Sequence, residues 1–238
     1  MTLSHKVLIV VPTYNEAENV DDLVAGIRRA LPEAHVLFVD DASPDGTAER
    51  VRAQQDRNPG LVHLVEREGK KGMGTAYLAG FAWALERDYD AIIEMDADLS
   101  HDPRALPTLI GLLSDADVVI GSRYVPGGRT EDWSRLRMAI SRFGSFYARV
   151  ILGLSIRDLT GGFNVWKRRV LETLSLDQVR SEGYSFQIEL KLRAARAGFR
   201  LVETPIVFVD RRAGQSKMSW EIVAEAIVRV WWLRLGGS

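Results

Sequence analysis

The chain has 238 residues, of which 46% are hydrophobic and 26% charged, and its formal net charge is −1. This length suits one large domain with a sizeable core, and the near-neutral charge gives no support to nucleic-acid binding as the main function. Cysteine is absent from the sequence, which excludes disulfides and thiolate metal sites. The apolar run near the N-terminus is too short for a signal peptide, and no long uncharged stretch could span a membrane. We therefore expect a cytoplasmic protein.

Short apolar runs alternate with amphipathic stretches along the chain. The runs predict strands at Lys6–Val11, Val36–Asp40, Leu61–Val65, Ala91–Asp96, Val118–Ser122 and Val202–Val209. The amphipathic stretches predict helices at Glu18–Leu31, Thr47–Asp56, Gly74–Arg87, Arg104–Leu113, Leu136–Leu152, Phe186–Ala197 and Trp220–Leu235. This alternation is typical of an α/β domain with a mostly parallel sheet and helices on both faces. Ligands of such sheets bind at the carboxyl ends of the strands, so the residues after each run are the candidates for function.

The first strand is followed by "PTYNEAEN", from Pro12 to Asn19. Asn15 and Glu18 have the spacing of a capping box, which predicts a helix start with Asn15 as the N-cap. Capping does not explain Tyr14 or Glu16, which could face a ligand across the strand ends.

The second strand is followed by "DDASPDGT", in which residues 43–46 predict a turn and Thr47 a helix cap. Asp40 and Asp41 remain open between a role in this turn and a role in holding a ligand. After the third strand, Gly72-Met73-Gly74 resembles a phosphate loop only weakly, because the spacing of a dinucleotide or P-loop motif is missing. Lys70 and Lys71 are open between a ligand role and a solvated face.

The fourth strand leads into "EMDADLSH", where Asp96 and Asp98 are two residues apart. In an extended segment such residues point to the same face, and two carboxylates so placed repel each other unless a cation lies between them. Mg²⁺ or Mn²⁺ with a nucleotide diphosphate would supply that charge. For His101, solvent exposure is the more common outcome for a histidine in a loop than ligation.

Six motifs together carry a family resemblance: "VVPTYNEAENV", "FVDDASPDGT", "MDADLSHDP", "VIGSRYVPGG", "DLTGGFNVWKR" and "VDRRAGQSKM". In this order they resemble the polyprenyl-phosphate (dolichyl-phosphate) mannose synthases of glycosyltransferase family 2, over nearly the whole chain. The resemblance implies a GT-A fold and an inverting transfer of mannose from GDP-mannose to a polyprenyl phosphate, with Mg²⁺ or Mn²⁺ as cofactor.

The resemblance also implies roles for individual residues. Asp96, Ala97 and Asp98 would hold the diphosphate and its metal, and Arg123 would face the phosphates and the sugar. Ser100 stands where some relatives have a glutamine ligand, so it is a weaker candidate for the metal. The guanosine pocket would be lined by Pro12, Tyr14, Glu16, Val39 and Asp41, and a loop with Arg211 and Lys217 would close over the pyrophosphate.

A phosphate acceptor agrees with the composition. Its second pKa lies near 6, so it is largely ionised at neutral pH and needs no strong general base. The four histidines, at positions 5, 35, 63 and 101, lie in no convincing catalytic setting. Arginines are suited to binding a phosphate. Arg123 and Arg137, with Ser141 as a nearby donor, are the candidates for the acceptor phosphate, and a solvated surface position is the alternative for Arg137.

Two helical stretches predict contact with a membrane surface or a partner. The region of about residues 133–154 mixes arginines with large apolar residues, as interfacial helices do, although a core helix with a basic outer face has the same pattern. In the last helix Glu221, Glu225 and Arg229 form one narrow polar stripe. We therefore expect a catalytic domain over residues 1–219 and a C-terminal amphipathic helix over residues 220–238. The protein would lie peripherally on the cytoplasmic face of the membrane, with a separate anchoring protein as a possible partner.

Several alternatives differ from this interpretation in definite features. A sugar-nucleotide pyrophosphorylase would need a basic glycine-rich loop after the first strand, and a haloacid-dehalogenase-type phosphatase would carry its acidic pair there. A processive polysaccharide synthase would show Gln-x-x-Arg-Trp, which is absent. Two alternatives stay open: a polyprenyl-phosphate glucosyltransferase that uses UDP-glucose, and a non-catalytic nucleotide-binding subunit.

Overall fold

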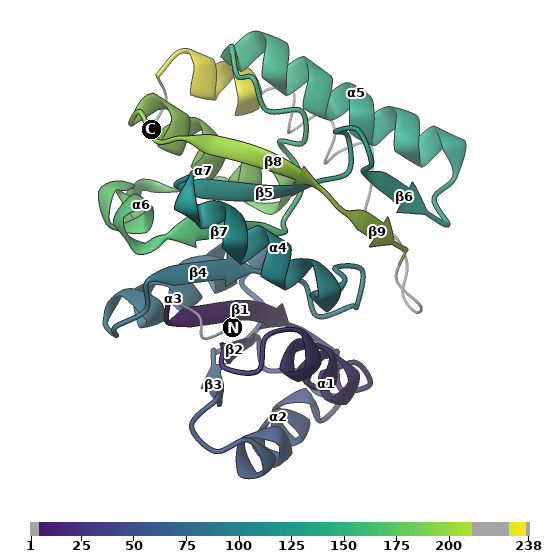
Figure 1. Cartoon of the computed structure of the whole chain (residues 1–238), viewed down its shortest axis with the longest axis vertical. Helices are drawn as coiled ribbons and strands as arrows, with labels where there is room; N and C mark the ends of the chain where they lie inside the picture. The colour runs from purple at the N-terminus through teal and green to yellow at the C-terminus, as the bar shows by residue number, and fades with distance from the viewer. Residues whose placement is uncertain (1–4, 211–228, 237–238) are drawn as a thin grey trace.

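The computed structural model describes residues 5–210 and 229–236. Its main sheet has seven strands in the order β3-β2-β1-β4-β7-β5-β8 (Figure 1). Six of the strands are parallel and one, β7, is antiparallel to its neighbours. The strands are β1 (Val7–Thr13), β2 (His35–Asp40), β3 (Val62–Glu66), β4 (Ala91–Glu94), β5 (Val118–Ser122), β7 (Asn164–Lys167) and β8 (Leu201–Pro205).

Helices cover both faces of this sheet, as the sequence predicted. Alternate residues of β1 belong to two different core clusters, with Leu8 and Val10 on one face and Ile9 and Val11 on the other. The longer helices are α1 (Val20–Ala30), α2 (Thr47–Arg57), α3 (Met73–Leu85), α5 (Arg135–Leu152) and α7 (Gly183–Arg196). The shorter ones are α4 (Leu106–Gly111) and α6 (Arg168–Thr173), with single 3₁₀ turns at Pro103–Ala105, Leu112–Ser114 and Leu176–Gln178. Figure 1 shows α1, α2 and α4 in front of the sheet.

The antiparallel strand β7 decides which segments meet at the carboxyl ends of the parallel strands. Asn164, the first residue of β7, lies opposite Glu94 at the end of β4 and opposite Ile120 in β5. The loop that precedes β7 therefore reaches the same edge of the sheet as the segments that follow β4 and β5. This edge is where ligands of α/β sheets bind.

A second sheet of two strands, β6 (Arg129–Glu131) and β9 (Val207–Val209), lies next to this edge. The predicted strand Val202–Val209 is divided, because β8 pairs with β5 while β9 pairs with β6. Neither β6 nor β7 was predicted from the sequence. Both are short, and β7 pairs with segments far from it in the chain.

The capping box predicted at Asn15 and Glu18 is wrong. Asn15 has a left-handed backbone with φ 60°, and α1 begins only at Val20. Thr47 is likewise the first residue of α2 and not its cap, which is Gly46. Its hydroxyl donates to Asp45 and accepts from the N–H of Glu16, so it ties the two loops after β1 and β2 together.

Most of the helix predicted at Trp220–Leu235 lies outside the described residues, and within them residues 229–234 are helical. Val230 and Leu233 are buried in the core, whereas Trp231 is 51% exposed. This part of the helix therefore packs one side on the domain and leaves another side open. In the portions of the chain that the structure describes, no helix is long and apolar enough to cross a membrane.

Candidate active site

The acidic pair lies in a tight bend after β4. The strand ends at Glu94, two residues earlier than predicted, so Asp96 and Asp98 are not the last residues of a strand. Leu99 has a left-handed φ of 62°, and the chain reverses there. Asp96 Oδ1 accepts a hydrogen bond from the Tyr77 hydroxyl at 3.1 Å. Asp98 Oδ1 accepts two from Ser100, 3.1 Å from its N–H and 2.5 Å from its hydroxyl.

His101 is buried beside this pair, contrary to the solvent-exposed position expected for a loop histidine. Its Nδ1 accepts a hydrogen bond from the N–H of Asp96 at 3.0 Å, which leaves the proton on Nε2, 3.9 Å from Asp96 Oδ2. Burial lowers the pKa of His101, although the charges of Asp96 and Asp98 oppose this shift. The ring also stacks on Phe163. We infer that His101 is neutral and that it holds the bend through its hydrogen bond with the N–H of Asp96.

The oxygen donors in this bend fit a hard divalent cation. Two carboxylates and the Ser100 hydroxyl are the ligand types that Mg²⁺ and Mn²⁺ prefer. Within residues 5–210 and 229–236, no group of three or more His, Cys, Asp or Glu side chains could hold a metal. Few protein ligands are usual where substrate phosphates complete the coordination of the ion. The Ser100 hydroxyl orients Asp98, and its direct contact with a metal stays a prediction.

Asp40 and Asp41, at the end of β2, have different roles. The Asp40 carboxylate accepts hydrogen bonds from Thr13 and Ser43, which assigns it to the turn. Asp41 forms a partly buried, bidentate ion pair with Arg67, with distances of 2.6 and 2.9 Å, and also accepts from the N–H of Lys71 at 3.1 Å. Asp41 is thus held in one orientation at the strand end, where the resemblance places the guanosine.

The other predicted nucleoside residues lie around the same end of the sheet. Tyr14 is half-buried, and the Lys70 ammonium lies 4.2 Å from the centre of its ring. Glu16 accepts a hydrogen bond from the Asn19 side chain. Pro12 is half-buried within β1, but the side chains of Val39 and Ala97 are buried in the core. Those two residues could therefore offer a nucleotide only main-chain atoms.

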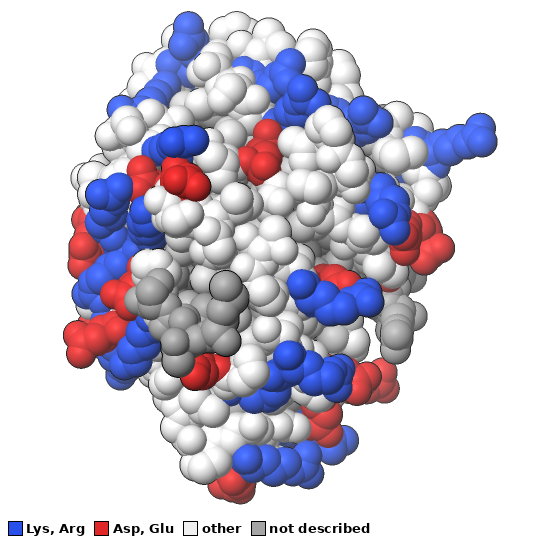
Figure 2. Space-filling view, viewed as in Figure 1, with Lys and Arg blue, Asp and Glu red and all other residues white. Residues whose placement is uncertain are grey.

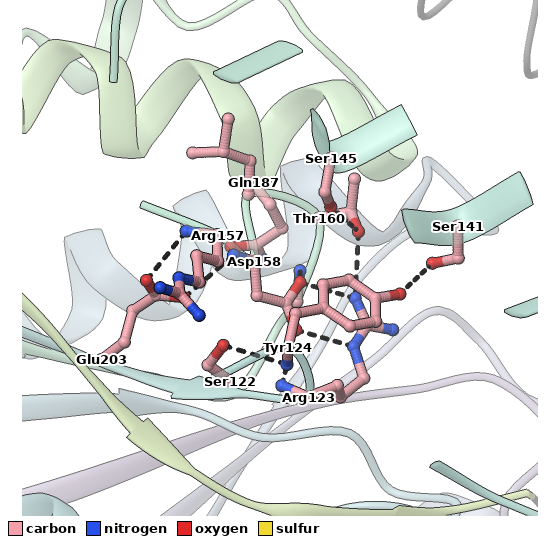
Figure 3. Close-up of polar contacts among 12 residues, drawn as sticks. Ser122, Arg123, Tyr124, Ser141, Ser145, Arg157, Asp158, Thr160, Gln187 and Glu203 are labelled. Carbon is pink, nitrogen blue, oxygen red and sulfur yellow. Dashed lines mark hydrogen bonds and ion pairs between the residues drawn. The ribbon is translucent and has the colours of Figure 1, made fainter. Parts of the chain in front are cut away.

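Arg123 follows β5 and is held by a buried carboxylate (Figure 3). Its Nε and Nη2 donate to Asp158 at 2.8 and 2.7 Å, and its backbone N–H donates to the same carboxylate at 2.9 Å. Nη2 also donates to the Thr160 hydroxyl at 2.9 Å. Burial by itself would lower the pKa of Arg123, but the Asp158 charge outweighs it and raises the pKa. The guanidinium is therefore charged and fixed, and Nη1 is the nitrogen that takes no part in these bonds.

Arg137 and Ser141 of α5 contact aromatic side chains that also lie near Arg123. The Arg137 guanidinium is 4.1 Å from the centre of the Trp133 ring, and that of Arg123 is 5.5 Å from the same ring. Ser141 accepts a hydrogen bond from the Tyr124 hydroxyl at 2.6 Å (Figure 3). Arg137 Nη1 donates to Asp210, but its buried Nε has no partner among the described residues. The structure thus groups the three candidates for the acceptor phosphate.

Phe208 in β9 links the acidic bend to this arginine cluster. Its ring makes edge contacts with His101 and Trp133, at centroid distances of 5.4 and 5.5 Å, and the Arg123 guanidinium lies 5.5 Å from its centre. The bend and the arginines are therefore two sides of one site. Arg211 and Lys217, predicted to close over the pyrophosphate, lie outside the described residues.

Sequence reasoning assigned no role to Asp158, Arg67 or a buried His101. Asp158 lies in the quoted motif "DLTGGFNVWKR", and this motif was the one signal that could have marked it. Its partner Arg123 is 35 residues away, and that pairing becomes visible only when β7 is placed between β4 and β5.

The fold and the site define a sugar-nucleotide-dependent transferase of the GT-A class. Residues 8–175 match the family described as Glycosyl transferase family 2, and the chain belongs to this family.

Two curated bacterial proteins are similar over almost the whole chain. An undecaprenyl-phosphate mannosyltransferase from Micrococcus luteus is 48% identical over 225 residues, covering 94% of this chain and 92% of that protein. A polyprenol monophosphomannose synthase from Mycolicibacterium smegmatis is 44% identical over 234 residues, covering 97% and 88%.

Solved structures share the fold at lower identity. A mannosyltransferase from Pyrobaculum calidifontis, in complex with GDP-Man and Mn²⁺, has a TM-score of 0.67 at 22% identity, covering 100% of this chain and 66% of that chain. Glucosyl-3-phosphoglycerate synthase from Mycobacterium tuberculosis, in complex with phosphoglyceric acid, has a TM-score of 0.69 at 18% identity, covering 98% and 81%. At these identities the likeness supports the GT-A fold alone.

Proposed function

We propose that the protein is an inverting mannosyltransferase that moves mannose from GDP-mannose to a polyprenyl phosphate, with Mg²⁺ or Mn²⁺ at the acidic bend. The observation that carries the proposal is identity of 48% and 44% with two proteins named for this transfer, over more than nine-tenths of the chain. The site agrees with it, since acids for a metal diphosphate and arginines for a second phosphate lie on its two sides.

The reaction needs no proton transfer by the protein. An oxygen of the acceptor phosphate forms a bond to the anomeric carbon as the bond from that carbon to the diphosphate breaks. A dianionic monoester becomes a monoanionic diester while the two negative charges on the diphosphate of GDP-mannose become three on GDP, so charge and atoms balance. Because the acceptor phosphate has a second pKa near 6, it is largely dianionic at neutral pH.

The task of the protein is then to bind, orient and neutralise negative charge. Asp96 and Asp98 would hold the divalent ion, which would offset the charge that develops on the leaving diphosphate. The fixed guanidinium of Arg123 would bind the acceptor phosphate beside the diphosphate. Arg137, whose Nη1 is bonded to Asp210 and whose buried Nε has no partner among the described residues, would bind it as well. Nδ1 of His101 already accepts the N–H of Asp96 and Nε2 carries the proton, so this ring offers no free lone pair for a general base, in agreement with a reaction that requires none.

Association with a lipid surface forms the second part of the proposal. On α5 the exposed apolar residues Leu136, Phe143 and Val150 recur every seven positions, so they share one face. Phe146 is also exposed. Leu136, Phe143 and Val150 each follow directly after an arginine, at positions 135, 142 and 149. In Figure 2 blue basic groups alternate with white surface along the top, where α5 lies in Figure 1. Such a face suits the headgroup region of an anionic, cytoplasmic leaflet.

The test of the transfer is an assay with GDP-mannose, UDP-glucose and other labelled nucleotide sugars, with a polyprenyl phosphate as acceptor, in the presence and absence of chelator. We expect product from GDP-mannose only, and its loss in chelator. Transfer from UDP-glucose and not from GDP-mannose would overturn the donor assignment. Binding of nucleotide with no transfer from any donor would favour a non-catalytic subunit.

The lipid surface is tested by flotation with vesicles of phosphatidylcholine containing anionic phosphatidylglycerol. Phe143→Ser combined with Phe146→Ser should reduce the bound fraction several-fold, because burying a large apolar side chain contributes about 1.5–3 kcal/mol. Met73→Ser, which changes an exposed apolar residue at the start of α3, is the matched control. Equal binding of both variants would count against α5 as the membrane-facing element.

A further inference from the structure

A lysine is fully buried beneath the site and was not singled out from the sequence. Lys191, in the middle of α7, has no exposed surface. Its ammonium donates to three backbone carbonyl groups of one loop, those of Asp158, Leu159 and Gly161, at 3.3, 3.1 and 2.6 Å. Three carbonyl dipoles that converge on one cation hold four consecutive residues of the loop in a single conformation.

The other side of this loop forms part of the site. The Asp158 carboxylate holds Arg123 and accepts the N–H of Gly161 at 3.0 Å (Figure 3). Gly162 lies against the acidic bend, since a Cβ added to it would come within 3.9 Å of Asp96 Oδ1 and of the His101 ring. The loop thus holds the arginine, and the residue that follows it, Gly162, lies near the proposed metal ligand Asp96, while Lys191 binds the carbonyl groups of the loop.

The charges around Lys191 come from several elements. Burial lowers its pKa to about 8, against the opposing effects of Asp158 in the loop and Glu94 at the end of β4. Arg123 lowers the pKa further, and Glu203 in β8 raises it. Replacing buried ionic groups by apolar ones of similar size is often neutral or even stabilising. A gain in stability is therefore a weak explanation for a buried lysine at this place.

We propose that Lys191 is a positioning residue for sugar transfer: its ammonium fixes the 158–161 loop so that Asp158 holds the Arg123 guanidinium toward the acceptor phosphate. The expected effect of Lys191 on sugar transfer rests on the proposed function, whereas its expected effect on the conformation of the loop does not. It assigns a role to a side chain that touches neither substrate. Its effect should fall mainly on the acceptor side of the site, because Asp158, whose carbonyl group accepts from Lys191, bonds Arg123 directly, whereas Gly162 beside Asp96 is not bonded to Lys191.

Hydrogen exchange tests the structural step without any substrate. In Lys191→Met the amides of Arg123 and Gly161, both donors to Asp158, should exchange at least about tenfold faster, while those of α1 keep the rate of the unaltered protein. Arg193→Met is the control on the same helix, because Arg193 pairs with Glu189 and not with the loop. Unchanged exchange at Arg123 and Gly161 in folded Lys191→Met would overturn the proposal.

Chemical rescue tests whether the charge matters and not only the packing. The chain has no cysteine, so Lys191→Cys carries a single thiol that can be alkylated in urea before refolding. Aminoethylation restores an ammonium at nearly the original position, whereas propylation gives an uncharged side chain of the same length. We expect the aminoethylated protein to recover slow exchange of the Arg123 amide and the propylated one not to. Equal behaviour of the two refolded proteins would contradict the proposal.

Kinetics add the functional readout. Relative to the unaltered enzyme, Lys191→Met should lose about 10–100-fold in kcat/KM for polyprenyl phosphate, in the range seen when outer partners of a site are removed. The affinity for GDP should change less than about twofold. A folded Lys191→Met with unaltered kcat/KM would overturn the kinetic role. If the unaltered protein itself transfers no sugar, the proposed function fails, and the two exchange experiments still decide whether Lys191 fixes the loop.

Discussion

The proposed donor and acceptor sides of the site are held together by contacts of different range. On the donor side, Asp98 is bonded to Ser100 two residues away, while Asp96 accepts from Tyr77 and Asp41 pairs with Arg67, 19 and 26 residues away. On the acceptor side, Arg123 pairs with Asp158 and Arg137 with Asp210, 35 and 73 residues away. These polar contacts of the donor side thus all lie within the N-terminal half of the chain. The acceptor side exists only when the whole sheet has formed.

The acidic bend should give the largest change in activity. Asp98→Ala removes one of the two carboxylates proposed to hold the metal ion that offsets the charge of the diphosphate, and we expect transfer to fall by about 10³-fold with little change in melting temperature. Asp102→Ala, four residues further along and paired with exposed Arg104, should keep activity within about twofold. Full activity of Asp98→Ala would remove the bend from the catalytic site.

The long-range pair should give the largest change in stability. Asp158→Ala leaves the buried charge of Arg123 without its partner, so the free energy of unfolding in urea should fall by about 3 kcal/mol. Glu172→Ala breaks the exposed pair with Arg168 and should cost less than about 1 kcal/mol. Similar losses of unfolding free energy in the two variants would mean that the buried Arg123–Asp158 pair stabilises the protein no more than an exposed surface pair does.

The donor side can be altered separately through Arg67. Arg67→Met removes the side-chain partner of both Asp41 oxygens and leaves only the bond from the N–H of Lys71, and we expect GDP to bind about tenfold more weakly in titration calorimetry. The KM for polyprenyl phosphate should stay nearly unchanged. Arg52→Met, which removes an exposed arginine of α2 paired with Glu66, is the matched control. A larger effect on the acceptor than on GDP would contradict the division of the site into two sides.

The smallest effect is expected from the histidine pair at the opposite edge of the sheet. His35 and His63 lie near the amino ends of β2 and β3, 3.1 Å apart, and burial together with nearby cations lowers the pKa of both below the usual 6.5. The unfolded chain therefore binds more protons than the folded one as the pH falls below about 6.5, and the free energy of unfolding should decrease there. His63→Gln should flatten this decrease between pH 5.5 and 7.5 in urea titrations, without affecting transfer at neutral pH. An equally steep decrease in the variant would assign the pH dependence to other groups.

What the sequence predicts correctly follows the same division. Strands with continuous apolar runs, such as β1 and β5, were predicted within about one or two residues, because burial on both faces leaves a strong local pattern. The acidic pair was likewise visible in the sequence as two carboxylates two residues apart. The burial of His101 was not, because it depends on Phe163 and Phe208, which are distant in the chain.

Two further misses have local physical causes. Asn15 has the sequence of an N-cap, yet its N–H donates to Ser43 in the neighbouring loop, and this contact favours the left-handed turn over the cap. The strand β7 has only four residues, too few for a recognisable alternation, and it is defined by its two partners more than by its own residues. Tertiary pairing overrides local preference at both places.

The central position of β7 has a consequence for the order in which the chain can assemble. During synthesis β4 and β5 emerge from the ribosome before β7, so each initially lacks the neighbour that separates them in the finished sheet. Unpaired strand edges attract other chains, so the nascent protein is exposed to misassembly during this interval. The loop that holds Arg123 takes its place only when β7 inserts, and Lys191 follows later still. Fragments that end before α7 should therefore be inactive, however complete their acidic bend.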